Sequence, residues 1–210
     1  MEFLFEQLVN WKFYLIGAYP NAPMTGLCVN IVLAVISIGI GLFFGVILGL
    51  LRTSCRRYVR HPVGIFIDVV RSTPLLMIIF WFYFFLPVVG AKMNLFWSAV
   101  VSLSVYASAY QAEIVRAGFI SIPMGQMEAA LSTGMSRFQA LKYVLLPQAF
   151  KKMLPSFVSF FNSLFKSTST VYIIGIVELT RTGVIISQRQ PNRIYAAYIT
   201  MAIGFWIVCY

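Results

Sequence analysis

The sequence predicts an all-α protein that crosses a lipid bilayer several times, and three observations carry this prediction. The 210 residues are 60% hydrophobic and only 10% charged, with a mean hydropathy of +0.85, whereas a water-soluble domain has a larger charged fraction. The apolar residues form long uncharged runs separated by short polar intervals. The net charge of +10 comes from lysines and arginines gathered in those intervals, which is the pattern that sets membrane topology.

The composition also argues against several other classes. A nucleic-acid-binding domain would gather its cations on one face of a soluble fold, so we expect no nucleic-acid partner. The three cysteines (Cys28, Cys55 and Cys209) are widely spaced and match neither a disulfide framework nor a metal site. The single His61 and the scattered acids form no catalytic group. We therefore predict no catalytic residue and no metal.

We predict one transmembrane domain over residues 1–210, with five spans. A run of about 20 apolar residues suffices to cross a bilayer, and the 27 residues from Thr25 to Leu51 carry no charge. The lead before this run lacks the basic start and the cleavage site of a signal peptide. The predicted spans are residues 25–51, 66–89, 95–118, 153–172 and 194–210. The last span has 17 residues and no basic tail, so we expect the chain to continue beyond Tyr210.

The basic residues assign the two sides of the membrane. The interval from Arg52 to Arg71 holds five arginines and one aspartate, and the interval from Glu113 to Lys152 holds five basic and two acidic residues. Both intervals are predicted to be cytoplasmic, which places the N-terminus outside and the C-terminus inside. Residues 171–193, with a net charge of +2, then lie outside, against the rule. An anionic substrate or an acidic docking partner would account for this excess.

Some charged residues near the cytoplasmic helix ends are spaced for pairing. Asp68 and Arg71 are three residues apart, as are Glu113 and Arg116, and this spacing brings two side chains together on a helix. Ionisable residues within a span are functional candidates. Because Glu113 and Arg116 fall near the membrane interface, we interpret them as a structural pair.

Glycines recur in the first span at a spacing that permits close helix packing. Gly41, Gly45 and Gly49 follow one another every four residues, and Gly39 precedes them. Small residues at this spacing let a second helix approach closely in a membrane. The alternative is that they reflect only the ordinary tolerance of membrane helices for glycine.

The longest polar-rich interval runs from Glu128 to Pro147 and predicts two short helices. The first ends near Thr133, where Gly134 can take the left-handed conformation that closes a helix. The second begins at Ser136, with Gln139 three residues later as a capping box. The proline then breaks or restarts the helix. Such a pair suits either insertion into a cleft of another protein or an amphipathic loop on the membrane surface.

This interval resembles the E-A-A-x3-G-x9-I-x-L-P motif of the permease subunits of bacterial ABC importers. The matching positions are Glu128, Ala129, Ala130, Gly134, Leu146 and Pro147, and the one departure is Val144 in place of isoleucine. In that family the loop, here residues 119–152, is cytoplasmic and enters a groove on the ATPase subunit. The resemblance implies the type I ABC importer fold in a bacterial cytoplasmic (inner) membrane, with a coupling helix between the third and fourth spans.

Further stretches resemble the polar amino-acid permeases of this family. They are Arg71-Ser72-Thr73-Pro74-Leu75-Leu76 with Trp81-Phe82-Tyr83 and Pro87, then Ala112 to Gly118, and Lys166 to Thr170. The Trp81-Phe82-Tyr83 variant is similar to the dicarboxylic amino-acid permeases. Outer cations suit a side-chain carboxylate, whereas a basic substrate would call for an acid deep in the path. We therefore favour an acidic amino acid, such as glutamate or aspartate, over other polar L-amino acids.

Polar side chains within the predicted spans are candidates for lining the transport path. Asn162, Ser163 and Lys166 share one face of the fourth span. A lysine there must either snorkel outward or face water, and we favour path lining over a snorkelling anchor. The candidate substrate contacts are Ser104, Ser108, Asn162, Ser163, Lys166 and Thr168.

The resemblance implies a complex with two permease halves, two ATPase subunits and an external solute-binding protein. The second half is this chain or a relative. The sequence has no G-x4-G-K-[ST] phosphate loop, so we expect ATP and Mg on the partner ATPase, no cofactor on this chain and no enzymatic activity of its own. Closure of the ATPase dimer would move the coupling loops and bias a two-state bundle.

Two other classes of function compete with this interpretation. A self-contained channel or ion-coupled secondary carrier is the main alternative, although carriers often contain inverted repeats and we find no repeat between the two halves. A membrane enzyme would need paired carboxylates or a His/Cys cluster within a span, and the sequence has neither.

Overall fold

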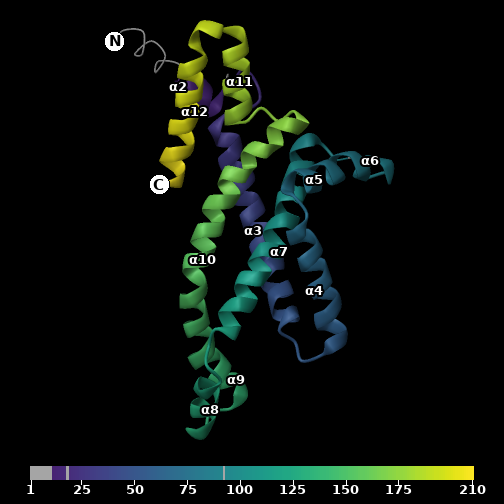
Figure 1. Cartoon of the computed structure of the whole chain (residues 1–210), viewed down its shortest axis with the longest axis vertical. Helices are drawn as coiled ribbons and strands as arrows, with labels where there is room; N and C mark the ends of the chain where they lie inside the picture. The colour runs from purple at the N-terminus through teal and green to yellow at the C-terminus, as the bar shows by residue number, and fades with distance from the viewer. Residues whose placement is uncertain (1–10, 18, 92) are drawn as a thin grey trace. The chain divides into compact units, whose positions relative to one another are not determined.

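The computed structural model describes residues 11–17, 19–91 and 93–210. Within these ranges the chain forms helices joined by turns, and the only β-type pairing is an isolated bridge between Gly26 and Glu178 (Figure 1). The chain divides into two compact units. Unit 1 comprises the described residues of 1–37, 75–103 and 162–210, and unit 2 comprises 38–74 and 104–161.

The helices follow one another along the whole described chain. The first part contains α2 (Trp11–Ile16), α3 (Leu27–Arg52), α4 (Arg57–Ser72), α5 (Leu75–Phe80), the π-helix η1 (Trp81–Phe85) and α6 (Leu86–Val88). The middle part contains α7 (Leu95–Ile120), α8 (Met124–Ser132), α9 (Arg137–Gln139), the π-helix η2 (Ala140–Leu145) and α10 (Leu146–Ser167). The last part contains the 3-10 helix η3 (Thr168–Ile174), α11 (Leu179–Arg189), the 3-10 helix η4 (Pro191–Arg193) and α12 (Ile194–Cys209).

Four of the five predicted spans coincide largely with single helices, namely α3, α7, α10 and α12. By length and composition alone, two described stretches qualify as membrane spans, Leu27–Arg52 and Pro191–Cys209. A third qualifies only as a bent pair, Arg57–Ser72 with Leu75–Val88. The helices α7 and α10 carry more polar residues, and their membrane crossing stays a prediction from charge and spacing.

The second predicted span, 66–89, differs from the structure because its helix is broken. α4 ends at Ser72, and the next helix begins only at Leu75. Pro74 has no N–H to donate to the preceding turn and disfavours helical geometry in the residue before it. Accordingly, Thr73 is extended, with φ −90° and ψ 129°. The aromatic run that follows adopts a π-helix.

Close packing of α3 against α7 holds unit 2 together. A Cβ atom added at Gly41, Gly45 or Gly49 would lie within 2.5–2.7 Å of atoms of α7, so only glycine fits at these three positions. Gly39, in contrast, has no neighbouring atom within 4 Å. The prediction of a close helix approach is therefore confirmed for the glycines spaced by four residues.

A buried polar cluster connects three elements of unit 1. The carboxylate of Glu178 caps α11 by accepting two backbone N–H groups of its first turn, each at 2.8 Å. Asn30 of α3 donates to Glu178 Oε2 (3.0 Å) and to Thr168 Oγ1 (2.9 Å), and it accepts the Leu179 N–H (3.0 Å). Burial raises the pKa of the Glu178 carboxyl, while these hydrogen bonds act in the opposite direction.

Candidate functional site

The loop that matches the E-A-A motif begins with α8, which is closed at its C-terminus by a glycine. Gly134 has φ +86°. Its N–H donates to the Leu131 carbonyl at 3.0 Å, and the N–H of Met135 donates to the Ala130 carbonyl at 3.4 Å. These two bonds form a Schellman motif, in which a left-handed residue satisfies the last carbonyls of a helix. The predicted end of the first loop helix is confirmed.

The second loop helix begins at a reciprocal cap. Ser136 accepts the Gln139 N–H on its Oγ at 3.3 Å, and its own N–H donates to Gln139 Oε1 at 2.8 Å. The predicted capping box is thus present. The short α9 leads into the π-helix η2, and α10 begins at Leu146 with Pro147 in its first turn. No residue separates η2 from α10, and Leu146 keeps helical dihedral angles (φ −60°, ψ −45°) with its N–H bonded to the Leu141 carbonyl. The prediction that Pro147 breaks or restarts the helix is therefore wrong, because the π-helical turn before it leads directly into α10.

The motif residues lie mostly on the surface of this loop. Glu128, Ala129, Gly134 and Pro147 are exposed, and Ala130 is buried. The carboxylate of Glu128 has no ion pair or hydrogen bond among the described residues. The loop also exposes large apolar side chains, namely Met124 (83%), Phe138 (71%), Tyr143 (63%) and Leu146 (47%). An exposed apolar group of this kind, with a charge beside it, is typical of a protein-binding surface.

The base of the loop is fixed to α7 and α10 within unit 2. Lys152 Nζ donates to the Ser121 carbonyl at 2.7 Å, and Gln148 Nε2 donates to Gln126 Oε1 at 3.0 Å. Beneath these bonds lies an apolar cluster formed by Val115, Ile122, Ala149, Met153 and Phe157. Figure 1 shows α8 and α9 side by side, between the end of α7 and the start of α10. These contacts bind α8 to the start of α10, and α10 to the residues that follow α7.

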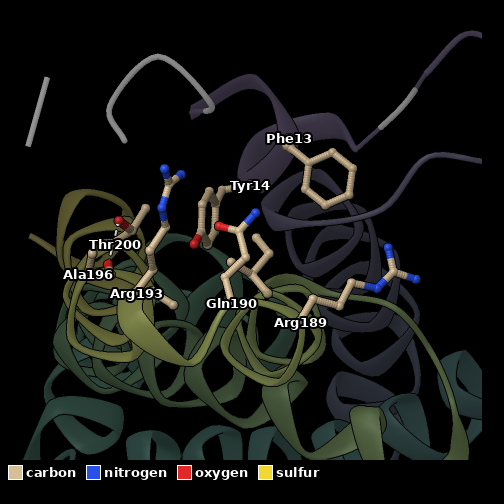
Figure 2. A pocket seen from close by; sticks show the side chains of 9 residues that line it. Phe13, Tyr14, Arg189, Gln190, Arg193, Ala196 and Thr200 are labelled. Carbon is tan, nitrogen blue, oxygen red and sulfur yellow. Dashed lines mark hydrogen bonds between the residues drawn. The ribbon is translucent and has the colours of Figure 1, made fainter. Parts of the chain in front are cut away.

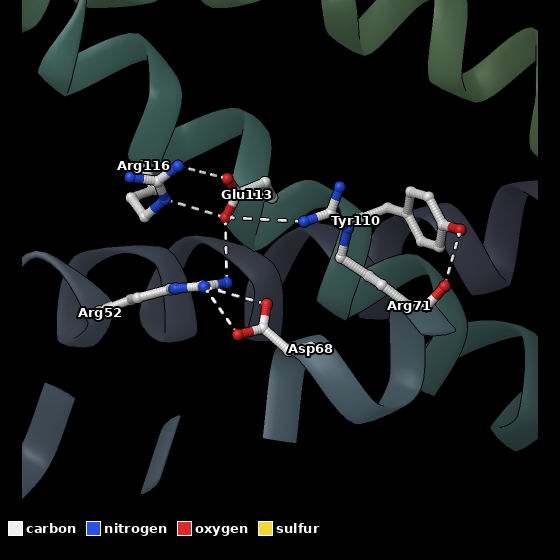
Figure 3. Close-up of polar contacts among 6 residues, drawn as sticks. All are labelled: Arg52, Asp68, Arg71, Tyr110, Glu113 and Arg116. Carbon is white, nitrogen blue, oxygen red and sulfur yellow. Dashed lines mark hydrogen bonds and ion pairs between the residues drawn. The ribbon is translucent and has the colours of Figure 1, made fainter. Parts of the chain in front are cut away.

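A network of charged side chains connects α3, α4 and α7 in unit 2 (Figure 3). Its centre is the Glu113 carboxylate, which accepts Arg116 Nε at 2.9 Å and Arg52 Nη1 at 3.0 Å and lies 3.9 Å from Arg71 Nη1. Arg52 also forms a bidentate pair with Asp68, at 2.9 and 3.0 Å. Three guanidinium groups thus share two carboxylates, and the network carries a net charge of +1.

The network confirms one predicted ion pair and corrects another. Glu113 and Arg116 are paired, as their spacing predicts. The predicted pair of Asp68 with Arg71 is wrong, because the Asp68 carboxylate pairs with Arg52 at the end of α3 instead. Arg71 instead lies over the Tyr110 ring, 5.3 Å from its centroid. The Tyr110 hydroxyl donates to the Arg71 carbonyl at 3.4 Å.

The candidate substrate contacts fall into separate places. Ser104 and Ser108 are buried on α7, and the Ser108 hydroxyl donates to the carbonyl one turn earlier at 2.8 Å. Thr168 is fully buried and accepts from Asn30. Ser163 is exposed.

Two of the candidates share a cavity. Asn162 and Lys166 line a space of about 510 Å³ between α10 and α12 in unit 1. The amide of Asn162 donates to the Cys209 carbonyl at 2.9 Å. The ammonium group of Lys166 has no ion pair or hydrogen bond among the described residues and is left facing this space.

Sequence reasoning overlooked three residues that organise the two units. Asn30 is a polar residue in an uncharged span, and that contrast is a signal that could have singled it out. Glu178 is not among the usual N-cap residues, and Arg52 was counted only as a topology charge. Their partners lie in distant parts of the chain, where no local spacing points to them.

The described residues contain no group of three or more His, Cys, Asp or Glu side chains that could hold a metal ion. The fold is that of an all-α, polytopic membrane protein. Among solved structures, an amino acid ABC transporter with histidines superposes with a TM-score of 0.81 at 33% identity, covering 88% of this chain and 86% of that chain. The inward-facing MetNI methionine ABC transporter has a TM-score of 0.66 at 21% identity and supports the fold alone. The architecture is the type I ABC importer fold.

Sequence comparisons identify the family. The model described as "Binding-protein-dependent transport system inner membrane component" matches residues 41–210. A probable glutamine ABC transporter permease protein, GlnP of Bacillus subtilis, is 37% identical over 86% of this chain and 84% of its own length. The glutamate/aspartate import permease protein GltK of Escherichia coli O157:H7 is 34% identical, covering 83% of each. The chain therefore belongs to the family of binding-protein-dependent transport system inner membrane components.

Proposed function

We propose that this chain is the transmembrane subunit of an ATP-driven amino-acid importer in a bacterial inner membrane. It would form the translocation path and bind the ATPase through the loop from α8 to η2. The observation that carries the proposal is the form of this loop, which presents the E-A-A motif on an exposed surface above a fixed base. Family membership and the fold support the same assignment.

The coupling mechanism follows from the contacts at the base of the loop. An ATPase groove would receive α8 and the exposed apolar side chains around Phe138. Because Lys152 and Gln148 fix the loop to α10 and to the end of α7, displacement of α8 would shift both helices. The bundle would then alternate between two states, with the equilibrium biased by the ATPase. ATP and Mg would be bound by the ATPase dimer.

The complex would also contain a second permease half, identical or related, and an extracytoplasmic solute-binding protein. The N-terminus would lie outside and the C-terminus in the cytoplasm, because the basic intervals around Arg52 and around the coupling loop favour the inner face. This orientation places the net charge of +2 in residues 171–193 outside.

We propose that the substrate is an acidic or other polar L-amino acid. The cavity at Asn162 and Lys166 offers an amide and an ammonium group, which can bind a carboxylate. Relatives named for glutamine, cystine and glutamate/aspartate transport have similar identities of 37%, 35% and 34%. Sequence identity to these relatives therefore does not select one substrate. The preference for glutamate or aspartate rests on the positively charged residues that are predicted to lie outside.

The docking proposal is tested at an exposed motif residue that lies within a helix and has no positive φ. Ala129→Trp would place a large ring on the surface of α8 without disturbing Gly134, which needs its positive φ. We expect loss of ATPase co-purification and of ATP-dependent uptake. The matched control is Tyr58→Trp, at a side chain that is 94% exposed on α4. Full ATPase recovery and uptake with Ala129→Trp would refute the docking role.

A further inference from the structure

Unit 2 contains a cavity of about 370 Å³ at the base of the coupling loop, lined mainly by α7 and α10. Its polar lining includes Arg71 at the end of α4, Tyr110 and Glu113 of α7, and Lys152 and Ser156 of α10. All of these residues belong to one compact unit. The volume exceeds the ~300 Å³ at which ordinary ligand pockets begin.

Unit 1 contains a further cavity, which differs in size. Figure 2 shows the side chains that line it, among them Tyr14, Arg189 and Arg193. Its volume of about 230 Å³ lies below that of ordinary ligand pockets. The two cavities have no lining residue in common, so the space in unit 2 is a separate and larger one.

The guanidinium group of Arg71 is the least engaged cation of the charged network (Figure 3). Its ion pair with Glu113 Oε2 is 3.9 Å long, which is beyond hydrogen-bond distance. The Glu113 carboxylate is already occupied by Arg116 Nε at 2.9 Å and by Arg52 Nη1 at 3.0 Å. A guanidinium group has five N–H donors, so Arg71 retains donors for a further acceptor.

Tyr110 fixes the position of Arg71 in the cavity wall. The guanidinium carbon lies 5.3 Å from the centroid of the Tyr110 ring, and the Tyr110 hydroxyl donates to the Arg71 carbonyl at 3.4 Å. The same ring stacks on Phe160, with centroids 5.6 Å apart and an interplanar angle of 11°. A cation that is held in place before binding loses less side-chain freedom when a ligand arrives.

Lys152 supplies a second cation that is only partly engaged. Its ammonium group donates to the Ser121 carbonyl at 2.7 Å and has no other hydrogen bond or ion pair among the described residues. An ammonium group has three N–H donors. The Lys152 residue is exposed, and the Arg71 side chain is 36% exposed, so a solute can reach both cations from the solvent.

We propose that this cavity binds a singly charged oxyanion. Arg71 and Lys152 provide charge-assisted hydrogen-bond donors, and the Ser156 hydroxyl provides a neutral one. Because Glu113 also lines the cavity, its described lining carries two positive charges and one negative charge. This balance suits a carboxylate or a phosphodiester better than a doubly charged phosphate. Apolar side chains for the rest of the ligand come from Ile114, Ala117 and Met153.

Two sources of such an oxyanion are compatible with the proposed function, on which the location of the cavity at the cytoplasmic side rests. One is the carboxylate of an amino acid in the cytoplasm, and the other is the phosphodiester of a lipid in the inner leaflet. Either anion would contact Lys152, which also fixes the start of α10 to the residue after α7. Occupancy would therefore favour the state in which these two cations line one cavity.

The test uses the complete complex of permease and ATPase in a maltoside detergent, with Arg71→Gln. The matched control is Arg116→Gln, which removes another guanidinium group from Glu113 but does not line the cavity. All variants carry Lys166→Gln, so that the cavity between α10 and α12 contributes less to binding. We measure equilibrium binding of radiolabelled L-glutamate without the binding protein. Loss of the charged donor is expected to weaken binding by about tenfold or more.

A second measurement distinguishes the two sources. Native mass spectrometry of the same complexes counts the phosphatidylglycerol molecules that each retains. If glutamate binding weakens in Arg71→Gln but not in Arg116→Gln, the ligand is the amino acid. If retention of phosphatidylglycerol shows that selective loss, the ligand is the lipid. Values for Arg71→Gln that equal those of Arg116→Gln in both measurements overturn the proposal.

Lys152→Gln is the second variant, because it removes the other cation and leaves the charged network intact. Its control is Lys151→Gln, at an exposed neighbour outside the cavity lining. The proposal requires Lys152→Gln to weaken binding of the same ligand as Arg71→Gln, and an unchanged affinity would contradict it. A complex that co-purifies with its ATPase and imports amino acids, yet shows no selective loss in Arg71→Gln, refutes the cavity proposal and leaves the proposed function standing.

Discussion

Arg52 and Glu113 form an ion pair between the end of α3 and the last third of α7, with Nη1 and Oε2 3.0 Å apart. Their side chains are 18% and 20% exposed, so solvent screens the pair only in part. Asp68 extends the contact to α4 through the same guanidinium group. One arginine thus joins three helices of unit 2, at positions 16 and 61 residues apart from it in sequence.

Replacing this arginine is expected to destabilise unit 2. Arg52→Gln would leave Asp68 without its described partner and would remove one of the cations at Glu113, at an expected cost of about 1–2 kcal/mol in unfolding free energy. Thermal unfolding of the protein in detergent measures the loss. Arg56→Gln serves as the control, since Arg56 is exposed and its side chain has no partner among the described residues. Equal melting temperatures for the two variants would show that the network adds nothing to stability.

The α3–α7 interface predicts a contrast between two glycine substitutions. Gly45→Ala would place a Cβ atom 2.7 Å from the Gln111 Cβ and 3.1 Å from the Ser108 carbonyl oxygen. Overpacking of this kind costs about 1–3 kcal/mol. Gly39→Ala meets no atom within 4 Å and is expected to leave stability unchanged or slightly higher. Denaturation in mixed micelles compares the two, and a Gly45→Ala variant as stable as Gly39→Ala would contradict the close packing.

Glu178 is expected to make stability depend on pH. Its pKa in the folded protein lies above the ordinary value of 4.5, with burial as the main cause. Between the unfolded and the folded pKa, the native state therefore binds more protons than the unfolded state. The contribution of this group is fully present below the unfolded pKa and is lost as pH rises through the folded pKa.

Glu178→Gln removes this titration, so comparison with the wild type isolates the contribution of Glu178 to the pH dependence of stability. As the pH rises above 4.5, the melting temperature of the wild type should fall relative to that of the variant. Scanning fluorimetry over that range measures the difference. A constant difference across the whole range would show that the carboxyl titrates alike in the folded and unfolded states.

Lys166 provides a test of the transport path. If its ammonium group contacts an acidic substrate in the cavity between α10 and α12, Lys166→Gln should raise the KM for glutamate by about tenfold. Lys151→Gln is the control, because Lys151 is exposed and has no described partner. Uptake into proteoliposomes at varied glutamate concentration yields the KM of each variant. A KM unchanged from that of Lys151→Gln would favour the snorkelling anchor.

The features that the sequence predicted well depend on neighbours within one helical turn. The Schellman motif at Gly134 and the capping box at Ser136 and Gln139 are built from residues at most five apart, so their chemistry is visible locally. The match to the E-A-A motif extends over the same interval. The glycine spacing in α3 likewise reports a property of one helix face, although the partner helix had to come from the structure.

The features that the sequence could not predict depend on competition between distant partners. Asp68 has a suitable partner in Arg71 on its own helix, yet it pairs with Arg52, and no spacing along α4 reveals the approach of α3. Asn30 and Glu178 are 148 residues apart, and their contact requires the tertiary fold. The break at Pro74 was open to prediction from its missing N–H, but the apolar run from Leu75 to Val89 is short for a membrane span by itself, which favoured a helix that begins earlier.

The most direct test of the central claim is reconstitution of the tagged chain in liposomes with its co-purified partners. We predict that an ATPase subunit and a second permease half are recovered with it, and that uptake of an amino acid requires both ATP and the binding protein. Recovery of this chain alone, with transport that continues without ATP, would contradict the account and indicate a channel or a secondary carrier.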